Sequence, residues 1–329
     1  MTNNTPDNLY DMEQNSKSGD LHALAQLGVY YLLGHQVSRD VKRGFQNVRK
    51  AAENGEIASQ TLLATLYASG LGTDEDWNEA YNWLVVAAQN GDPKAIGQVT
   101  HFIPELTNPA CKMTWQDVRN RLGEIVSLQV NNATSHFEEP HIRTLEGFLD
   151  ARTCSYIIKQ ATPLLQRAYV NDGEGGAVLD TTRTNSAMSF FPLDNDLVIQ
   201  SVNKKIAAFL GGPVAHGEPL SALHYTPGQT YQDHYDFFNP DYPAHVPHLE
   251  SGGQRIKTFL VYLNDGFAGG ETCFPKLDWK YKGKVGEAIV FDNVDDKGNL
   301  ISDSLHAGLP TLSGEKWLLS KWLKDKAQY

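Results

Sequence analysis

The apolar residues of the first hundred positions follow helical spacing, and they also repeat at a longer period. Gly19, Gly55 and Gly91 lie 36 residues apart, and an acidic residue follows each glycine. The sequence Ala51-Ala-Glu-Asn-Gly55 returns as Ala87-Ala-Gln-Asn-Gly91. A period in the thirties is typical of stacked helix pairs, in which alanines let the helices approach and a glycine ends each helix. The pattern predicts a helical repeat array over residues 16–100.

The segments on either side of this array have a weaker pattern. Residues 1–15 are rich in Asn and Asp, and this composition predicts a disordered tail. We interpret residues 101–140 as a helical cap followed by a linker that ends at Pro140. The cap is a helix that begins at Thr114 and carries apolar residues at helical spacing, namely Trp115, Val118, Leu122 and Ile125.

From His141 onward the pattern changes from helices to strands. A helix is predicted after Asp150, and another over residues 195–210, where Gly211 ends it. Four apolar runs then lie between Gly, Pro, Asn and Asp turns, and each predicts a strand: Leu220–Tyr225, Lys257–Leu263, Glu287–Phe291 and Lys316–Leu323. The chain is therefore predicted to be an α+β protein of two domains. The second, over residues 141–329, would be a jelly roll (a double-stranded β-helix) with supporting helices, whose wide mouth can hold a ligand.

Composition and charge exclude several classes of function. Lys and Arg total 28 against 39 Asp and Glu, and no basic cluster is present, which argues against binding to nucleic acid. No apolar stretch is long enough to span a membrane, and the polar N-terminus lacks the apolar core of a signal peptide. Cys111, Cys154 and Cys273 are widely spaced, so we expect reduced thiols in a cytoplasmic protein.

The candidate chemistry is concentrated in His234-x-Asp236 and in His306, about seventy residues later. In an extended segment, residues two apart project to the same side, so His234 and Asp236 would share one face. A second histidine from a distant strand would complete three metal ligands. Two histidines and one carboxylate that leave open coordination positions are diagnostic of non-haem Fe(II) oxygenases.

Five blocks of sequence support this hypothesis. They are Leu223-x-Tyr225-x-x-Gly228-x-x-Tyr231-x-x-His234-x-Asp236, Arg255-x-x-Thr258-x-x-x-Tyr262-Leu-Asn264, Gly269-Gly-Glu-Thr-x-Phe-Pro275, Gly286-Glu-Ala-x-x-Phe291 and His306-x-x-x-Pro310-x-x-x-Gly314-x-Lys316-Trp317. In order and spacing these blocks resemble the catalytic domain of the prolyl 4-hydroxylase branch of the 2-oxoglutarate oxygenases. The resemblance covers about residues 142–323, and it implies Fe(II), 2-oxoglutarate and O2 as cofactors, with ascorbate as reductant. The repeats in front resemble Sel1-like repeats of the tetratricopeptide class.

The second carboxylate of 2-oxoglutarate would be buried deep in the barrel, where an unpaired charge is costly. Lys316 is the candidate cation, and the resemblance implies Lys or Arg at this position. The hydroxyls of Tyr225, Thr258 and Tyr262 are candidate hydrogen-bond donors to the same cofactor, although a packing role in the core is an equal alternative for all three. The Gly269–Pro275 block is expected to shape a turn and a strand without taking part in the chemistry.

Substrate contacts are predicted for Arg183 and Arg255, together with Tyr231 and Trp322. The two arginines have an alternative role as structural ion-pair partners. Two loops, over residues 171–182 and 237–254, are expected to border the substrate site.

The most concrete hypothesis is a prolyl 4-hydroxylase-type enzyme that acts on a peptide or protein, recruited by the helical repeats. It would couple C–H hydroxylation to the oxidative decarboxylation of 2-oxoglutarate to succinate and CO2. Two alternatives remain: a hydroxylase of a free amino acid or other small metabolite, and a repeat scaffold whose oxygenase domain is inactive.

Overall fold

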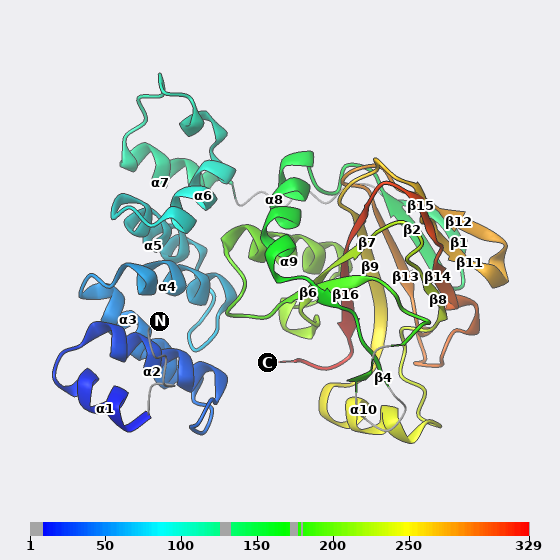
Figure 1. Cartoon of the computed structure of the whole chain (residues 1–329), viewed down its shortest axis with the longest axis horizontal. Helices are drawn as coiled ribbons and strands as arrows, with labels where there is room; N and C mark the ends of the chain where they lie inside the picture. Colours follow the sequence, from blue (N-terminus) through cyan, green and yellow to red (C-terminus); the bar gives the residue numbers. More distant parts are fainter. Residues whose placement is uncertain (1–8, 126–132, 172–176, 179, 329) are drawn as a thin grey trace. The chain divides into compact units, whose positions relative to one another are not determined.

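The computed structural model describes residues 9–125, 133–171, 177–178 and 180–328. The chain divides into two compact units, which Figure 1 colours along the sequence. Of the described residues, the first unit contains 9–125 together with Pro192–Val202. The second contains the remaining described residues. Within the described residues, no helix is both long and apolar enough to cross a membrane.

The described N-terminal part of the first unit is entirely helical and forms the predicted repeat array (Figure 1). From α1 to α6 each helix packs against the next one along the chain, and α7 packs against α5. They are α1 (Leu9–Lys17), α2 (Leu21–Leu33), α3 (Val41–Glu53), α4 (Ile57–Ser69), α5 (Trp77–Gln89), α6 (Pro93–Phe102) and α7 (Trp115–Glu124).

The repeated glycine–acid pair explains where the helix pairs begin and end. Gly19, Gly55 and Gly91 have φ values of 98°, 94° and 86°, a backbone conformation that favours glycine. The acid after each glycine caps the next helix, because its carboxylate accepts from free N–H groups of the first turn. As predicted, a glycine follows the end of α1, α3 and α5.

Two expectations for the flanking segments are wrong. Part of the predicted disordered tail forms α1, which is held by the buried side chain of Met12; residues 1–8 lie outside the described residues. The predicted linker ends in strand β1 (Ala133–Glu138), which pairs with β2 (His141–Leu145). The helix capped by Thr114 is present as α7, with a capping box between Thr114 and Asp117.

The second unit contains two main antiparallel sheets, consistent with the jelly roll expected from the sequence (Figure 1). The larger sheet has the order β1, β2, β13 (Ala288–Asp292), β9 (Arg255–Tyr262), β16 (Lys316–Lys324), β7 (Leu220–Tyr225), β6 (Ser186–Phe190) and β3 (Gln166–Arg167). The smaller sheet has the order β12 (Trp279–Tyr281), β11 (Thr272–Phe274), β14 (His306–Gly308) and β8 (Tyr231–His234). Two-stranded pairs are formed by β10 (Ala268–Gly269) with β15 (Thr311–Ser313) and by β4 (Val170–Asn171) with β5 (Ala177–Val178).

Alternation along the strands of the larger sheet separates an inner face from an outer face. Inner residues such as Tyr262 and Leu318 form one core cluster with Phe274 of the smaller sheet. Outer residues such as Phe259 pack against Phe148 and against Phe209 of helix α9 (Leu197–Leu210). Two further helices of this unit are α8 (Ala151–Ala161) and α10 (Val246–Gly252). The inner face is the one that carries the candidate site.

Candidate active site

Three candidate metal ligands converge at the inner side of the smaller sheet. His234 ends β8 and His306 begins β14, and the two are directly opposite each other in the antiparallel register. Asp236 follows two residues after His234. One potential ligand atom from each of the three side chains lies within 4.8 Å of the other two. Strand pairing thus explains why residues seventy positions apart form one cluster.

Backbone carbonyls orient both imidazoles. His234 Nδ1 lies 2.8 Å from the carbonyl of Gln232, and His306 Nδ1 lies 2.9 Å from the carbonyl of Ser304. Because a carbonyl only accepts, each Nδ1 carries the proton and each Nε2 keeps its lone pair. The Nε2 atoms of His234 and His306 lie 3.7 and 3.4 Å from the Asp236 carboxylate oxygens. This is the orientation that a metal-binding histidine requires.

The protonation states also suit a cation. Burial, and then the neighbouring His306, lower the pKa of the His234 imidazole, so it stays neutral. Burial alone would raise the pKa of the Asp236 carboxyl, but the two histidines and Arg255 lower it, so it stays ionised. Metal binding requires neutral imidazoles and an ionised carboxylate, so the cluster can take a cation without releasing protons from these two groups.

The Asp236 carboxylate is fixed by buried hydrogen bonds. Thr258 Oγ1 donates to Asp236 Oδ2 at 2.6 Å, and Asn293 Nδ2 donates to Thr258 Oγ1 at 3.0 Å. Thr258 is 1% exposed, and it is absent from the residues that line the cavity described next. The prediction that Thr258 donates to the cofactor is therefore wrong, because its proton is already used by the carboxylate.

A cavity extends from this cluster into the barrel. Lys316 lines it and is fully buried, and its Nζ has no hydrogen-bond partner among the described residues. The ring of Tyr225, the residue opposite Lys316 on β7, lies 4.9 Å from Nζ. Burial lowers the pKa of Lys316 to about 7. A buried ammonium without a partner destabilises the folded protein, so an anion bound in the cavity would be stabilised by pairing with it.

Comparisons with known proteins agree with this geometry. Residues 220–324 match the model of the 2OG-Fe(II) oxygenase superfamily, and residues 21–56 and 57–92 each match the Sel1 repeat. Prolyl 4-hydroxylase 1 of Arabidopsis thaliana is 36% identical over 203 residues, which are 57% of this chain and 70% of the relative. Probable prolyl 4-hydroxylase 10 of the same plant is 34% identical over 205 residues, which are 56% and 69%. The chain belongs to the 2OG-Fe(II) oxygenase superfamily. Its oxygenase domain is of the prolyl 4-hydroxylase type.

Among solved structures, similarity was found to the 2-oxoglutarate complex of viral collagen prolyl hydroxylase from Paramecium Bursaria Chlorella virus-1. That chain is 30% identical, with a TM-score of 0.43, and the match covers 56% of this chain and 95% of the viral one.

The family of this dioxygenase uses Fe(II), 2-oxoglutarate and O2, and the residues of the site fit these groups. Two imidazoles and one carboxylate are a donor set suited to Fe(II). The unpartnered Lys316 ammonium lines the same cavity as the three donors, where it would meet the far carboxylate of the dianionic cofactor. This orphaned buried cation is the observation in the structure that agrees most directly with 2-oxoglutarate.

Of the two other residues predicted to contact the cofactor, one lines the cavity and the other does not. Tyr225 lines the cavity, as expected. Tyr262 does not, and its hydroxyl donates to the carbonyl of Tyr281 and contacts Thr272 Oγ1. The prediction for Tyr262 is wrong because a core partner takes its proton. Thr272 of the Gly-Gly-Glu-Thr block lines the cavity instead, although that block was expected to have only a structural role.

Ser320 was also missed by the sequence analysis. It is 1% exposed, it lines the cavity, and its Oγ has no partner among the described residues. Lys316, Leu318, Ser320 and Trp322 are alternate residues of β16, and all four line the cavity. The period-two pattern of this strand was the signal that would have found Ser320.

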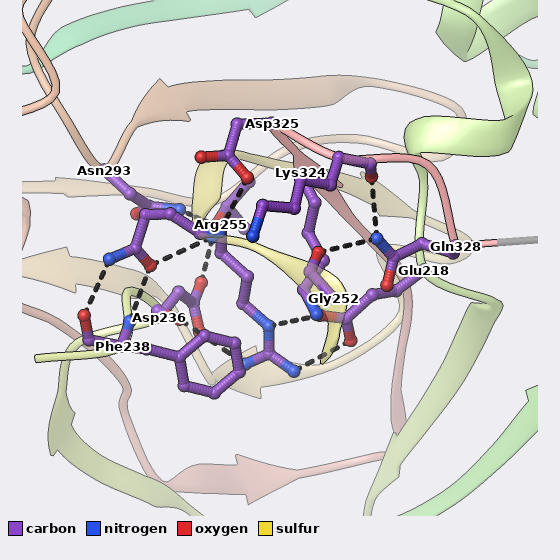
Figure 2. Close-up of polar contacts among 12 residues, drawn as sticks. Glu218, Asp236, Phe238, Gly252, Arg255, Asn293, Lys324, Asp325 and Gln328 are labelled. Atoms are coloured by element: carbon purple, nitrogen blue, oxygen red, sulfur yellow. Dashed lines mark hydrogen bonds and ion pairs between the residues drawn. The ribbon is translucent and has the colours of Figure 1, made fainter. Parts of the chain in front are cut away.

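Arg255 contacts the site through other protein groups. Its guanidinium donates two hydrogen bonds to Glu218, at 2.6 and 2.8 Å, and one to the backbone carbonyl of Asp236 at 3.4 Å (Figure 2). It lies over the ring of Trp322, at 3.8 Å from the centroid, and also over that of Phe238. The alternative role of an ion-pair partner therefore describes Arg255 well. Its remaining exposed surface still borders the groove outside the cavity.

Arg183, Tyr231 and His234 form a stack at the cavity entrance. The Tyr231 ring lies parallel to the His234 ring, with centroids 3.5 Å apart, and the Arg183 guanidinium lies 4.8 Å from the Tyr231 centroid. Arg183, Tyr231 and Trp322 line both the cavity and an outer groove. The structure thus brings together all four predicted substrate residues.

The outer groove is bordered by parts of both loops expected from the sequence. Residues of the expected 237–254 loop line it, including Phe238, His245 and His248. From the other expected loop, residues 172–176 and 179 lie outside the described residues, while Asp180 and Thr182 border the groove.

The hydrogen bond from Thr258 leads to a testable prediction. We expect Thr258→Val to weaken metal binding by about 10–100-fold, because it removes a donor that orients a ligand while keeping side-chain volume. Isothermal titration with Co(II) in place of Fe(II) would measure this affinity. Thr311→Val is the matched control, because Thr311 is equally buried and its hydroxyl has no partner among the described residues. Equal affinities for Thr258→Val and the control would contradict the orienting role.

Proposed function

We propose that this oxygenase hydroxylates prolyl residues of a peptide or protein and converts 2-oxoglutarate to succinate and CO2. One observation carries the proposal. A cavity lined by two histidines and a carboxylate is also lined by the unpartnered ammonium of Lys316. The similarity to enzymes named prolyl 4-hydroxylases supports proline as the target.

In this proposal His234 and His306 hold Fe(II) through Nε2, and Asp236 holds it through its carboxylate. Lys316 pairs with the far carboxylate of 2-oxoglutarate, and Tyr225 lies beside it. Iron and 2-oxoglutarate, once bound, supply the activation of O2 that oxidises a C–H bond. The protein positions the reacting C–H group, and the leucines that line the cavity exclude water: Leu223, Leu260 and Leu318.

The entrance of the cavity suits a prolyl side chain. Trp322 and Tyr231 line both the cavity and the groove, so a side chain that enters from the groove passes between the two spaces beside aromatic rings. An apolar pyrrolidine ring gains buried area against such rings without needing a hydrogen-bond partner. The groove continues well beyond the cavity, along Tyr235, Phe238 and His248. This length favours an extended chain over a free amino acid.

The proposal is tested by succinate release with Fe(II), 2-oxoglutarate, ascorbate as the proposed reductant, and air. Proline-containing peptides and free proline would be compared, and mass spectrometry would locate any added oxygen. We expect peptides to stimulate succinate release and to gain one oxygen on proline. Stimulation by free proline or another small metabolite alone would contradict the peptide part of the proposal. Iron binding without any succinate release would contradict the chemistry and favour a scaffold role.

A further inference from the structure

The first unit includes a segment that is distant in sequence from the repeats. Pro192–Val202 lies between β6 and β7 along the chain, yet its contacts group it with the helical array. Leu193 packs against a core cluster built by α2, α3 and α4. Leu197 is fully buried in the next cluster, with Ala64 of α4, Ala95 of α6 and Val99 of α6. Two apolar side chains thus anchor the segment in the array.

Two polar side chains of the array bind the backbone of this segment. Gln98 Oε1 accepts from the Leu197 N–H at 2.9 Å, and Thr65 Oγ1 lies 3.4 Å from the Asn195 carbonyl and equally far from the Thr61 carbonyl of its own helix. Gln98 and Thr65 are 1% and 3% exposed. Polar side chains this deeply buried are normally paired, and the partner of Gln98 lies 99 residues further along the chain.

The hydrogen bond from the Leu197 N–H to Gln98 satisfies a backbone group at the start of a helix. Leu197 is the first residue of α9, and the first N–H groups of a helix have no partner within the helix. Asp196 caps the helix for Ile199, with its carboxylate 2.9 Å from the Ile199 nitrogen. The Leu197 N–H is buried away from water, and the side chain of Gln98 satisfies it. Gln98 thus completes the cap of α9 from another helix.

We infer that the face of α4 and α6 that carries Thr65 and Gln98 is a binding site for the chain's own segment Pro192–Val202. A helical-repeat array commonly binds an extended segment along one face, and here the occupant belongs to the same chain. An external peptide on this face would have to displace Leu193 and Leu197 and leave the Leu197 N–H unpaired. A substrate protein recruited by the repeats would therefore bind to a different part of their surface.

Hydrogen–deuterium exchange on the full-length chain tests this inference. Gln98→Met removes the acceptor and keeps the length of the side chain. We expect the amides of residues 192–202 to exchange about tenfold faster, since a buried N–H is left without a partner, while exchange in α2 and α3 stays unchanged. Gln116→Met is the matched control, because Gln116 lies on the exposed side of α7 in the same unit.

A second variant keeps the test decisive if Gln98→Met has a small effect. Leu197→Ala removes a buried apolar contact and is expected to accelerate exchange in the same segment. Unchanged exchange of residues 192–202 in both variants would overturn the inference, and so would an equal acceleration throughout the repeats. The readout needs no iron, 2-oxoglutarate or substrate, so its outcome is independent of the proposed reaction.

Discussion

Replacing Asp236 with alanine is expected to abolish 2-oxoglutarate turnover. The substitution removes the only carboxylate of the ligand cluster and leaves its two imidazoles, so Fe(II) affinity should fall by at least about 100-fold. Succinate release should then equal the background without enzyme. Both quantities can be measured on one preparation, by metal titration and by quantifying succinate.

Asp233→Ala is the matched control for this experiment. Asp233 lies on the same strand, one residue before His234, and its side chain is exposed. It should bind iron and release succinate as the unmodified enzyme does. Turnover by Asp236→Ala close to that of the control would rule out the proposed metal centre.

Lys316→Met is expected to weaken the binding of 2-oxoglutarate and to raise the stability of the cofactor-free protein. Losing the cation leaves the far carboxylate of 2-oxoglutarate buried without a partner, which costs about 3–5 kcal/mol and would raise the dissociation constant by about two to four orders of magnitude. The cofactor-free protein should become more stable, because a buried ammonium without a partner is replaced by an apolar group of similar length. Isothermal titration with 2-oxoglutarate and thermal unfolding would measure the two effects.

The gain in stability should depend on pH. Burial lowers the pKa of Lys316 from its ordinary value of 10.5 to about 7, so between these values the unfolded chain binds more protons than the folded one. The destabilising effect of Lys316 is then largest below pH 7 and disappears as the pH approaches 10.5. The melting temperature of Lys316→Met should exceed that of the unmodified protein most at the acidic end of this range.

Lys321→Met provides a control on the same strand. Lys321 is also buried with a pKa lowered to about 7, but it lies on the outer face, where its Nζ donates to Asn203. This variant should retain its affinity for 2-oxoglutarate. Equal losses of affinity in the two lysine variants would show that the effect is not specific to the cavity.

The sequence predicted the site best where chemistry and spacing are tightly linked. His-x-Asp places two ligands on one side of an extended segment in any fold, and a cation in a barrel strand is predicted from the charge of the cofactor. Tyr225 lines the cavity opposite Lys316, while its hydrogen bond to the cofactor stays a prediction.

The hydroxyl groups show where sequence reasoning stops. Alternation along β9 correctly placed Thr258 and Tyr262 on the inner face, but the direction of a hydroxyl proton depends on neighbours from other strands. Asp236 and the Tyr281 carbonyl take these protons, and neither contact follows from local sequence. Arg255 is similar, since its partner Glu218 lies 37 residues earlier.

The segment Pro192–Val202 could not have been assigned to the repeat array by any periodic pattern. Its apolar residues fit an ordinary amphipathic helix, and they would pack equally well against a sheet. Only the contacts of Leu197 and Gln98 in three dimensions reveal the partner.

Incubation with isotopically heavy O2 is the most direct test of the account. The enzyme would be supplied with Fe(II), 2-oxoglutarate and a proline-containing peptide that stimulates succinate release, and both products would be analysed by mass spectrometry. We expect one heavy oxygen atom in succinate and one on a prolyl residue of the peptide, in equal amounts. Labelled succinate with no label on proline would contradict the claim that this site is a prolyl hydroxylase.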